Sequence, residues 1–434
     1  MSNWLVRGGS VLSGTVSVQG SKNAALPILA ATLLVEEPVA LSRFPILRDT
    51  ENMLGILKSL GCTVTREGDT VVVDSSTANT HVLPGTLSKQ LRSSIFLLGS
   101  VLSRFSAAEA PYPGGCEIGN RPIDLHLQGL RRLNAGIEER GGRILCTGGR
   151  LKGATVDLGY PSVGATENIM LAAAKAEGQT VIRNAACEPE IVDLMQFLCA
   201  CGFRVRGAGT PTVVVDGVKK GHGVAYRIMP DRIVTGTYLI AAAITGGDIT
   251  VTDTLPETVG PLLLKLSECG ASVTKTSDAI RVRANGRPDC VGYTETRPYP
   301  GFPTDLQPQL FSMLSVANGT SVLTENVFEN RFRHAQELMK MGAVNRILDR
   351  TAIITGVKRL HGASVTAHDL RGGAALVLAG LSAEGDTQIE HAERIERGYE
   401  RLDSVIERLG GSVTRKEENI GKEEETQRSG EFPV

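Results

Sequence analysis

The sequence predicts an α/β protein of two domains, each built from three helix-strand-helix-strand-strand units. A helix rich in small and apolar residues recurs six times, at intervals of about 70 residues. After each comes a β-branched segment and then an amphipathic helix that ends at glycine. Hairpin patterns close several units, as in residues 63–74.

The six recurring helices are apolar almost all round, so we expect them to be buried. Most begin on Ser, Thr or Asp, which are favourable N-cap residues. Their expected starts are Ser21, Ser88, Ser162, Asp231, Thr304 and Leu370. The amphipathic helices should each bury one stripe. In the last of them the stripe is Leu402, Val405, Ile406 and Leu409, at i, i+3, i+4, i+7 spacing.

Six units exceed one ordinary core, so we predict two domains, divided near 229–231. The strands between Leu5 and Val18 precede the first unit and could complete the second domain, because the sixth unit lacks a full hairpin. The predicted divisions are 22–229 for the first domain, 1–21 with 230–415 for the second, and 416–434 for a charged, disordered tail.

Composition excludes several classes of protein. A net charge of -1 and 4% aromatic residues give no footprint for nucleic acid. We find no signal peptide and no apolar run of about 18 residues, so we expect a cytoplasmic protein without membrane contact. The eight cysteines form no CxxC pair and the histidines no HxH or HxxxH, which favours reduced thiols and no metal site.

Residues 111–122 form a loop that cannot be helix interior or central strand, because it holds three glycines and three prolines. It presents Cys116 and Arg121. A cysteine is usually a small buried hydrophobe, but flexible glycines and a nearby cation favour an exposed, ionisable thiol, whose pKa Glu117 could raise. His126 leaves a Cys/His hydrolase pair open, although we favour an interhelical hydrogen bond for it.

Cations stand where helices begin, although a helix N-terminus disfavours them by about 0.3–1 kcal/mol. Each alone could be a solvated surface group. Together they favour an anionic ligand that carries phosphate and carboxylate groups. These cations are Lys22, Arg92, Arg121, Arg331, Arg371 and Arg397.

Asp305 could stabilise a helix dipole or act as a general base among these cations. Asp49, Glu188 and Asp231 could be ion-pair partners of the arginines. No GxGxxG, P-loop or GxSxG pattern supports a dinucleotide, P-loop or serine hydrolase site.

At these residues the chain resembles the UDP-N-acetylglucosamine enolpyruvyl transferase family. The related enolpyruvyl transferases that use shikimate 3-phosphate share the fold but not the Gly-Gly-Cys loop. The matching segments are Gly20–Ala24, Pro113–Asp124, Pro161–Thr166, Glu188–Asp193, Pro303–Asp305, Glu329–Phe332, Asp369–Arg371 and Arg397–Arg401.

The resemblance implies two inside-out α/β barrel domains with the active site between them. It implies transfer of the enolpyruvyl group of phosphoenolpyruvate to UDP-N-acetylglucosamine with release of phosphate, the first committed step of peptidoglycan synthesis. No metal or organic cofactor is implied. Domain closure over the Cys116 loop and covalent inhibition by fosfomycin at Cys116 are implied as well.

The resemblance also implies roles for individual residues. Cys116 matches the proton donor to the methylene carbon, Asp305 the group that takes the proton of the sugar 3-hydroxyl, and Lys22 and Arg397 catalytic phosphate binders. Matches to phosphoenolpyruvate-binding residues are Lys22, Asn23, Arg121, Arg331, Arg371 and Arg397. Matches to UDP-sugar contacts are Asn23, Arg92, Arg121, Pro122, Ile123, Asp124, Leu125, Ser162, Val163, Gly164, Asp305 and Val327.

Departures from the family pattern are small: Asn120 before Arg121, and Gly372-Gly373 after Arg371. Three alternatives stay open. The acceptor could be shikimate 3-phosphate, the chain could be a catalytically silent regulatory paralogue, or it could be a repeat scaffold for protein partners.

Overall fold

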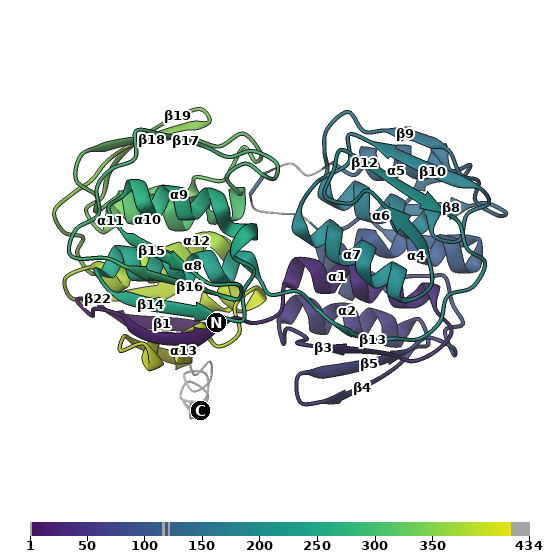
Figure 1. Cartoon of the computed structure of the whole chain (residues 1–434), viewed down its shortest axis with the longest axis horizontal. Helices are drawn as coiled ribbons and strands as arrows, with labels where there is room; N and C mark the ends of the chain where they lie inside the picture. Colours follow the sequence, from purple (N-terminus) through teal and green to yellow (C-terminus); the bar gives the residue numbers. More distant parts are fainter. Residues whose placement is uncertain (1, 115–117, 120–121, 418–434) are drawn as a thin grey trace, which may run out of the picture.

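The computed structural model of the chain describes residues 2–114, 118–119 and 122–417. Two hydrophobic cores form separately. One gathers apolar residues between Ala24 and Met229. The other joins residues between Trp4 and Val18 to those between Ile233 and Val413. Figure 1 shows the two halves side by side, with the purple strand β1 lying in the otherwise green-to-yellow half.

The first half holds seven of the described α-helices. These are α1 (Lys22–Ala31), α2 (Arg48–Ser59), α3 (Gly85–Gln90), α4 (Phe96–Phe105), α5 (Asp124–Arg132), α6 (Val163–Ala173) and α7 (Pro189–Ala200). Its strands are β3 (Val39–Ser42), β4 (Thr63–Glu67), β5 (Thr70–Asp74), β6 (Ala107–Pro111), β7 (Gly136–Arg140), β8 (Arg143–Thr147), β9 (Thr155–Asp157), β10 (Gln179–Arg183), β11 (Arg204–Arg206), β12 (Thr212–Asp216) and β13 (Ala225–Arg227).

The second half begins and ends with strands that meet. Its helices are α8 (Arg232–Thr245), α9 (Gly260–Glu268), α10 (Gln307–Leu314), α11 (Arg333–Lys340), α12 (Leu370–Ser382) and α13 (Leu402–Arg408). Its strands are β1 (Ser2–Arg7), β2 (Ser13–Ser17), β14 (Asp248–Thr252), β15 (Ser272–Lys275), β16 (Ala279–Arg283), β17 (Tyr293–Glu295), β18 (Thr320–Thr324), β19 (Val344–Leu348), β20 (Thr351–Thr355), β21 (Ser364–Thr366), β22 (Asp386–Glu390) and β23 (Ser412–Glu417).

The strands form six open sheets, three in each half. Five have four strands and one, in the order β6-β8-β7, has three. Among the described residues no sheet closes on itself, so the structure contains no closed barrel. Each four-stranded sheet includes a parallel strand that precedes a buried helix, for example β9 beside β10 and β21 beside β22. Sequence patterns missed most of these strands because four of the five have only three residues.

The chain crosses between the halves twice, and each crossing exchanges a strand. β2 precedes α1 of the first half, yet it pairs with β14 of the second. β13 precedes α8 of the second half, yet it pairs with β3 of the first. The crossings run side by side, since Ser21 N donates to Met229 O (2.8 Å) and Asp231 N to Gln19 O (3.0 Å). The two helices that follow, α1 and α8, therefore begin close together.

Small residues allow the buried helices to approach closely. A side chain at Gly99 of α4 would meet the backbone oxygen of Asn168 in α6 at 2.4 Å. The amide N–H of Gly99 donates to Asn168 Oδ1 (2.8 Å), which joins the two helices directly. Glycine is required at this position because any Cβ would push the helices apart.

Several element boundaries differ from the predictions. The helix expected from Ser88 breaks at the extended residue Leu91, and α4 starts only at Phe96 after the 3-10 helix η2 (Arg92–Ile95). The helix expected from Thr304 begins with the 3-10 helix η4 (Thr304–Leu306). Arg397 ends the 3-10 helix η5 (Ala392–Arg397) and does not open an amphipathic helix.

The predicted start of the tail, at residue 416, is two residues too early. Lys416 and Glu417 belong to β23, which pairs with β1. Pairing with the N-terminal strand therefore adds two residues of ordered strand, and the remainder of the predicted tail, 418–434, lies outside the described residues.

Candidate active site

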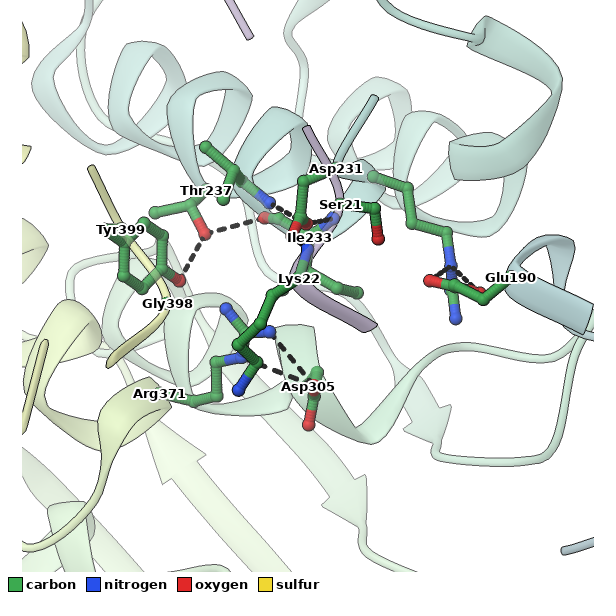
Figure 2. A network of polar contacts seen from close by, with 12 residues as sticks. Ser21, Lys22, Glu190, Asp231, Ile233, Thr237, Asp305, Arg371, Gly398 and Tyr399 are labelled. Carbon is green, nitrogen blue, oxygen red and sulfur yellow. Dashed lines mark hydrogen bonds and ion pairs between the residues drawn. The ribbon is translucent and has the colours of Figure 1, made fainter. Parts of the chain in front are cut away.

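Asp305 of η4 lies between two arginines of the second half. Its Oδ1 accepts a hydrogen bond from Arg331 Nη2 (2.8 Å), and its Oδ2 accepts from Arg371 Nη2 and Nε (3.2 and 3.3 Å). Both arginine side chains are only 2% exposed. Burial alone would raise the pKa of Asp305, but Arg371, Arg331 and Lys22 hold it far below its usual range. Figure 2 shows Arg371 pointing at this carboxylate.

Lys22 approaches from the first half. It is the first residue of α1, whose N-cap Ser21 accepts a hydrogen bond from Ala24 N. Its ammonium Nζ lies 3.3 Å from Asp49 Oδ2. Burial lowers the pKa of Lys22, and nearby Arg371 and Arg397 lower it further, against the opposing effect of Asp49 and Asp305. Positive charges held this close together favour the binding of an anion.

Asp49 joins this lysine to Arg397 of the second half. Arg397 Nε and Nη2 donate to Asp49 Oδ1 and Oδ2 at 2.9 and 3.3 Å. Burial would raise the pKa of Asp49, but Lys22 and Arg397 lower it overall. The expectation that Asp49 would pair with one of the arginines is therefore confirmed.

Asp231 and Glu188 do not form the ion pairs with arginine that we expected within the described part of the chain. Asp231 caps α8, since its Oδ1 accepts from Ile233 N (2.9 Å) and Val234 N (3.0 Å). Its Oδ2 accepts from Lys22 N (3.2 Å), so one carboxylate fixes the start of both α8 and α1. Glu188 Oε1 accepts from Tyr299 N (3.2 Å) across the two halves.

The cluster carries an excess of positive charge. Four cations (Lys22, Arg331, Arg371 and Arg397) surround the carboxylates of Asp49 and Asp305. Their guanidinium groups present forked donors that suit carboxylate and phosphate oxygens. The arrangement can therefore hold a ligand with both kinds of anionic group where the halves meet.

The residues expected to contact a UDP-sugar fall on helix starts of the first half. Ser162, the N-cap of α6, is followed by Val163 and Gly164, and all three are partly buried. A Cβ on Gly164 would lie 3.1 Å from the His126 ring, so the start of α6 packs directly against α5. The other matched residues at this point are Pro122, Ile123, Asp124 and Leu125, at the beginning of α5.

The remaining matched residues are spread over both halves. Asn23 is the second residue of α1, and Arg92 opens η2. Val327 N donates to Glu325 Oε1 (2.8 Å) in the second half. Cys116 and Arg121, with their neighbours Glu117 and Asn120, lie outside the described residues. Of that loop, Ile118 O accepts a hydrogen bond from Asn330 N (3.1 Å), which belongs to the second half.

Two features of the site were missed from the sequence. Arg232 Nε donates to both carboxylate oxygens of Glu190 (3.0 and 3.2 Å), which forms a buried ion pair between the halves. Tyr399 places its ring beneath Arg371, with 5.4 Å between the guanidinium carbon and the ring centroid. Glu190 and Tyr399 lie within matching segments, but neither residue breaks a local sequence preference.

A further expectation concerned His126. His126 Nδ1 lies 3.2 Å from Asn168 Nδ2, which confirms the predicted interhelical contact. Cys199, in α7, is exposed, whereas Cys201, the C-cap of that helix, is buried. Among residues 2–114, 118–119 and 122–417, no cluster of three or more potential metal ligands occurs. No helix in this described part is long and apolar enough to span a membrane.

Comparison with known proteins gives a consistent result. The family described as EPSP synthase (3-phosphoshikimate 1-carboxyvinyltransferase) matches residues 6–406. The enolpyruvyl transferase NikO from Streptomyces tendae has a similar fold, with a TM-score of 0.86 at 24% identity, covering 95% of this chain and 98% of that one. Fold, family match and cation cluster together define an enolpyruvyl transferase.

Relatives of higher identity narrow the assignment. UDP-N-acetylglucosamine 1-carboxyvinyltransferase 2 of Caldanaerobacter subterraneus subsp. tengcongensis is 51% identical over 415 residues, which cover 96% of this chain and 100% of the relative. UDP-N-acetylglucosamine 1-carboxyvinyltransferase 1 of Carboxydothermus hydrogenoformans is 47% identical, with 96% and 98% covered. The chain belongs to the UDP-N-acetylglucosamine 1-carboxyvinyltransferase family.

Proposed function

We propose that this protein transfers the enolpyruvyl group of phosphoenolpyruvate to the 3-hydroxyl of UDP-N-acetylglucosamine and releases phosphate. The observation that carries the proposal is the convergence of Lys22, Arg331, Arg371 and Arg397 around two carboxylates between the halves. Phosphoenolpyruvate carries one phosphate and one carboxylate, which match this excess of cations. The names of the relatives support the sugar nucleotide as acceptor.

The reaction is an addition followed by an elimination. A thiol, assigned to Cys116, gives its proton to the methylene carbon, which makes the neighbouring carbon electrophilic. The sugar 3-oxygen attacks that carbon while Asp305 takes the hydroxyl proton. Loss of a proton from the new methyl group then expels phosphate and restores the double bond. Fixed cations stabilise the charged tetrahedral intermediate without reorganisation.

Each cation has an assigned ligand group. Lys22, Arg121 and Arg397 hold the phosphate, while Arg331 and Arg371 hold the carboxylate. Asn23 contacts both substrates. The contacts assigned to the UDP-sugar are Arg92, Arg121, Pro122, Ile123, Asp124, Leu125, Ser162, Val163, Gly164, Asp305 and Val327. Fosfomycin is expected to alkylate Cys116.

Asp305 becomes an effective base only when another anion binds to its arginine partners. With both oxygens bound to Arg331 and Arg371, its pKa lies far below the usual range, so it holds a proton poorly. A substrate carboxylate would take over some of these donors and raise the basicity of Asp305. Deprotonation of the sugar then follows the arrival of phosphoenolpyruvate.

The two halves supply the moving parts. We assign 22–229 to one domain and 1–21 with 230–415 to the other, each built from three helix-strand-helix-strand-strand repeats. The two separate cores support this division. Closure of the domains around the substrates would exclude water from the charged intermediate. We also propose a cytoplasmic location for this enzyme.

Phosphate release tests the function directly. The purified protein is incubated with phosphoenolpyruvate and either UDP-N-acetylglucosamine or shikimate 3-phosphate. Release with the UDP-sugar alone supports the proposal. Release with shikimate 3-phosphate alone would replace the acceptor, and no release with either would favour a silent regulatory paralogue or a binding scaffold.

Two variants test the assigned proton transfers. Cys116→Ser should lose fosfomycin labelling and most turnover while its fold is kept. Asp305→Ala should lose at least about 100-fold in kcat, since general acid-base catalysis contributes factors of that size, while the UDP-sugar still binds. Normal turnover in either variant would remove that residue from the mechanism.

A further inference from the structure

Tyr399 is one of the largest fully buried side chains in the second half, with 1% of its surface exposed. Its hydroxyl lies 2.9 Å from Thr237 Oγ1 of α8 and accepts a hydrogen bond from Gln309 Nε2 of α10 (3.0 Å). Thr237 Oγ1 is itself anchored, because it donates to Ile233 O (2.8 Å). Figure 2 shows Tyr399 and Thr237 joined in this way.

The ring of Tyr399 faces a third helix. Arg371, in the first turn of α12, lies over it at 5.4 Å. One side chain thus contacts all three buried helices of the second half, which also pack against one another. A desolvated guanidinium is attracted to an aromatic face, so the ring helps to hold Arg371 in place.

The backbone around Tyr399 connects this anchor to the rest of the cluster. Arg397, two residues earlier, binds Asp49 of the first half. Gly398 O accepts from Gln19 Nε2 (3.3 Å), and Glu400 N donates to Gln19 Oε1 (2.8 Å) at the first crossing. The segment 397–400 is therefore fixed by Tyr399 on one side and by the crossing on the other.

We propose that Tyr399 is a positioning residue that sets the planes of Arg371 and Arg397 together, so that carboxylate and phosphate of one substrate are bound at a fixed spacing. This inference rests on the proposed function. Tyr399 itself does not touch the reacting atoms. Its ring supports the carboxylate-binding arginine, and its hydroxyl fixes the segment that carries the phosphate-binding arginine.

Substitution separates positioning from simple packing. Tyr399→Leu removes ring and hydroxyl, and it should raise the KM for phosphoenolpyruvate more than tenfold while the KM for UDP-N-acetylglucosamine changes less than threefold. Tyr399→Phe keeps the ring and should raise the first KM only two- to fivefold. Thr237→Val, which removes one of the hydroxyl's two partners and leaves Gln309, should raise this KM no more than Tyr399→Phe does.

Phe197→Leu is the matched control. Phe197 is also one of the largest fully buried side chains and packs edge-on against Tyr226, with 5.3 Å between ring centroids, but it belongs to the core of the first half. Its loss should lower the melting temperature similarly and leave both KM values within threefold. Equal changes in both KM values for Tyr399→Leu, or the same pattern in Phe197→Leu, would overturn the inference.

The remaining outcomes are also decisive. If Tyr399→Leu does not fold, the phosphoenolpyruvate KM of Tyr399→Phe decides, and an unchanged value rejects the anchoring role. If the unaltered protein shows no transfer at all, the proposed function has failed. In that case phosphoenolpyruvate is titrated against the unaltered protein and Tyr399→Phe in a thermal-shift assay, and equal shifts reject the inference separately.

Discussion

At the residue scale, the buried His334 beside the site makes the stability of the protein depend on pH. The ring is 1% exposed and lies edge-on to Phe311, with 4.9 Å between ring centroids. Burial lowers the pKa of His334 below its ordinary value, Asp369 opposes that shift, and Arg331 adds to it. The folded protein therefore holds this histidine neutral beside an arginine of the cluster.

The sign of the effect follows from linkage. A histidine whose pKa is lowered on folding contributes stability above its unfolded pKa, near 6.5, and that stability is lost as the pH falls below it. By pH 5 the loss is about 2 kcal/mol, or about 4–8 °C in melting temperature. His334→Phe should remove this part of the acid sensitivity, measured as melting temperature between pH 7.5 and 5.

Exposed His81 provides the control, since His81→Gln should leave the slope of melting temperature against pH unchanged. The same acid slope in His334→Phe and in the unaltered protein would show that other groups cause it.

At the scale of elements, the starts of α1 and α8 depend on one carboxylate. Asp231 caps α8 with Oδ1 and binds Lys22 N with Oδ2. A helix cap alone could be supplied by serine, which is as favourable as aspartate at this position. The second contact needs a side chain with two acceptors, so Lys22 is positioned by the cap of a neighbouring helix.

Asp231→Ser therefore separates the two contacts. The cap of α8 is kept, so the melting temperature should stay within about 4 °C, which corresponds to about 1 kcal/mol. The start of α1 loses its partner, and turnover should fall between about 10- and 100-fold through misplacement of Lys22. Turnover equal to that of the unaltered protein would show that Ser21 and the crossing position α1 without Asp231.

Elements of this kind were predictable from the sequence only where local rules specify them. Ser162 and Asp231 were correctly placed as N-caps, and the stripe from Leu402 to Leu409 is buried. The interruption at Leu91 was not foreseen, because nothing in that segment excludes a continuous helix. Three-residue strands such as β9 have no period of their own and form only because β10 lies beside them.

The site divides in the same way. Cations predicted at helix starts are visible in the sequence as local conflicts. Lys22, Arg331, Arg371 and Arg397 do meet in the structure, although Arg397 ends η5 and does not open a helix. Their partners are not visible, since Asp49 and Arg397 are 348 residues apart and either acid could have bound either base. The contacts of Tyr399 and Glu190 could not be predicted, because a buried tyrosine and a glutamate near a helix start are both common in proteins.

At the scale of the whole molecule, two contacts between the halves differ in how strongly salt should weaken them. The Glu190–Arg232 pair is buried, with side chains 3% and 9% exposed. At the cavity of about 810 Å³ between the halves, Arg43 Nη2 pairs with Asp253 Oδ1 (2.5 Å), and the Asp253 side chain is 46% exposed. The first contact is shielded from salt, whereas the second is open to solvent and screened.

Glu190→Gln should reveal the difference. Removing one partner leaves the Arg232 guanidinium buried without its counter-ion, which costs about 3–5 kcal/mol and lowers the midpoint of denaturant unfolding. Asp248→Asn is the matched control, because Arg281 also donates to both of its oxygens (2.6 and 2.7 Å) but on the surface. That variant should unfold near the normal midpoint. Equal midpoints for the two variants would mean that the buried pair adds no stability.

The exchange of strands between the halves has a consequence for synthesis on the ribosome. β1 pairs with β22 and β23, and β2 with β14, so both strands are synthesised before their partners, the last of which is residues 412–417. Residues 22–229 contain a full core and can fold during translation. Until their partners are made, β1 and β2 expose unpaired backbone N–H and C=O groups, which favour aggregation. The delay between the synthesis of β1 and that of its partners is therefore a risk while the protein folds, and not in the folded enzyme.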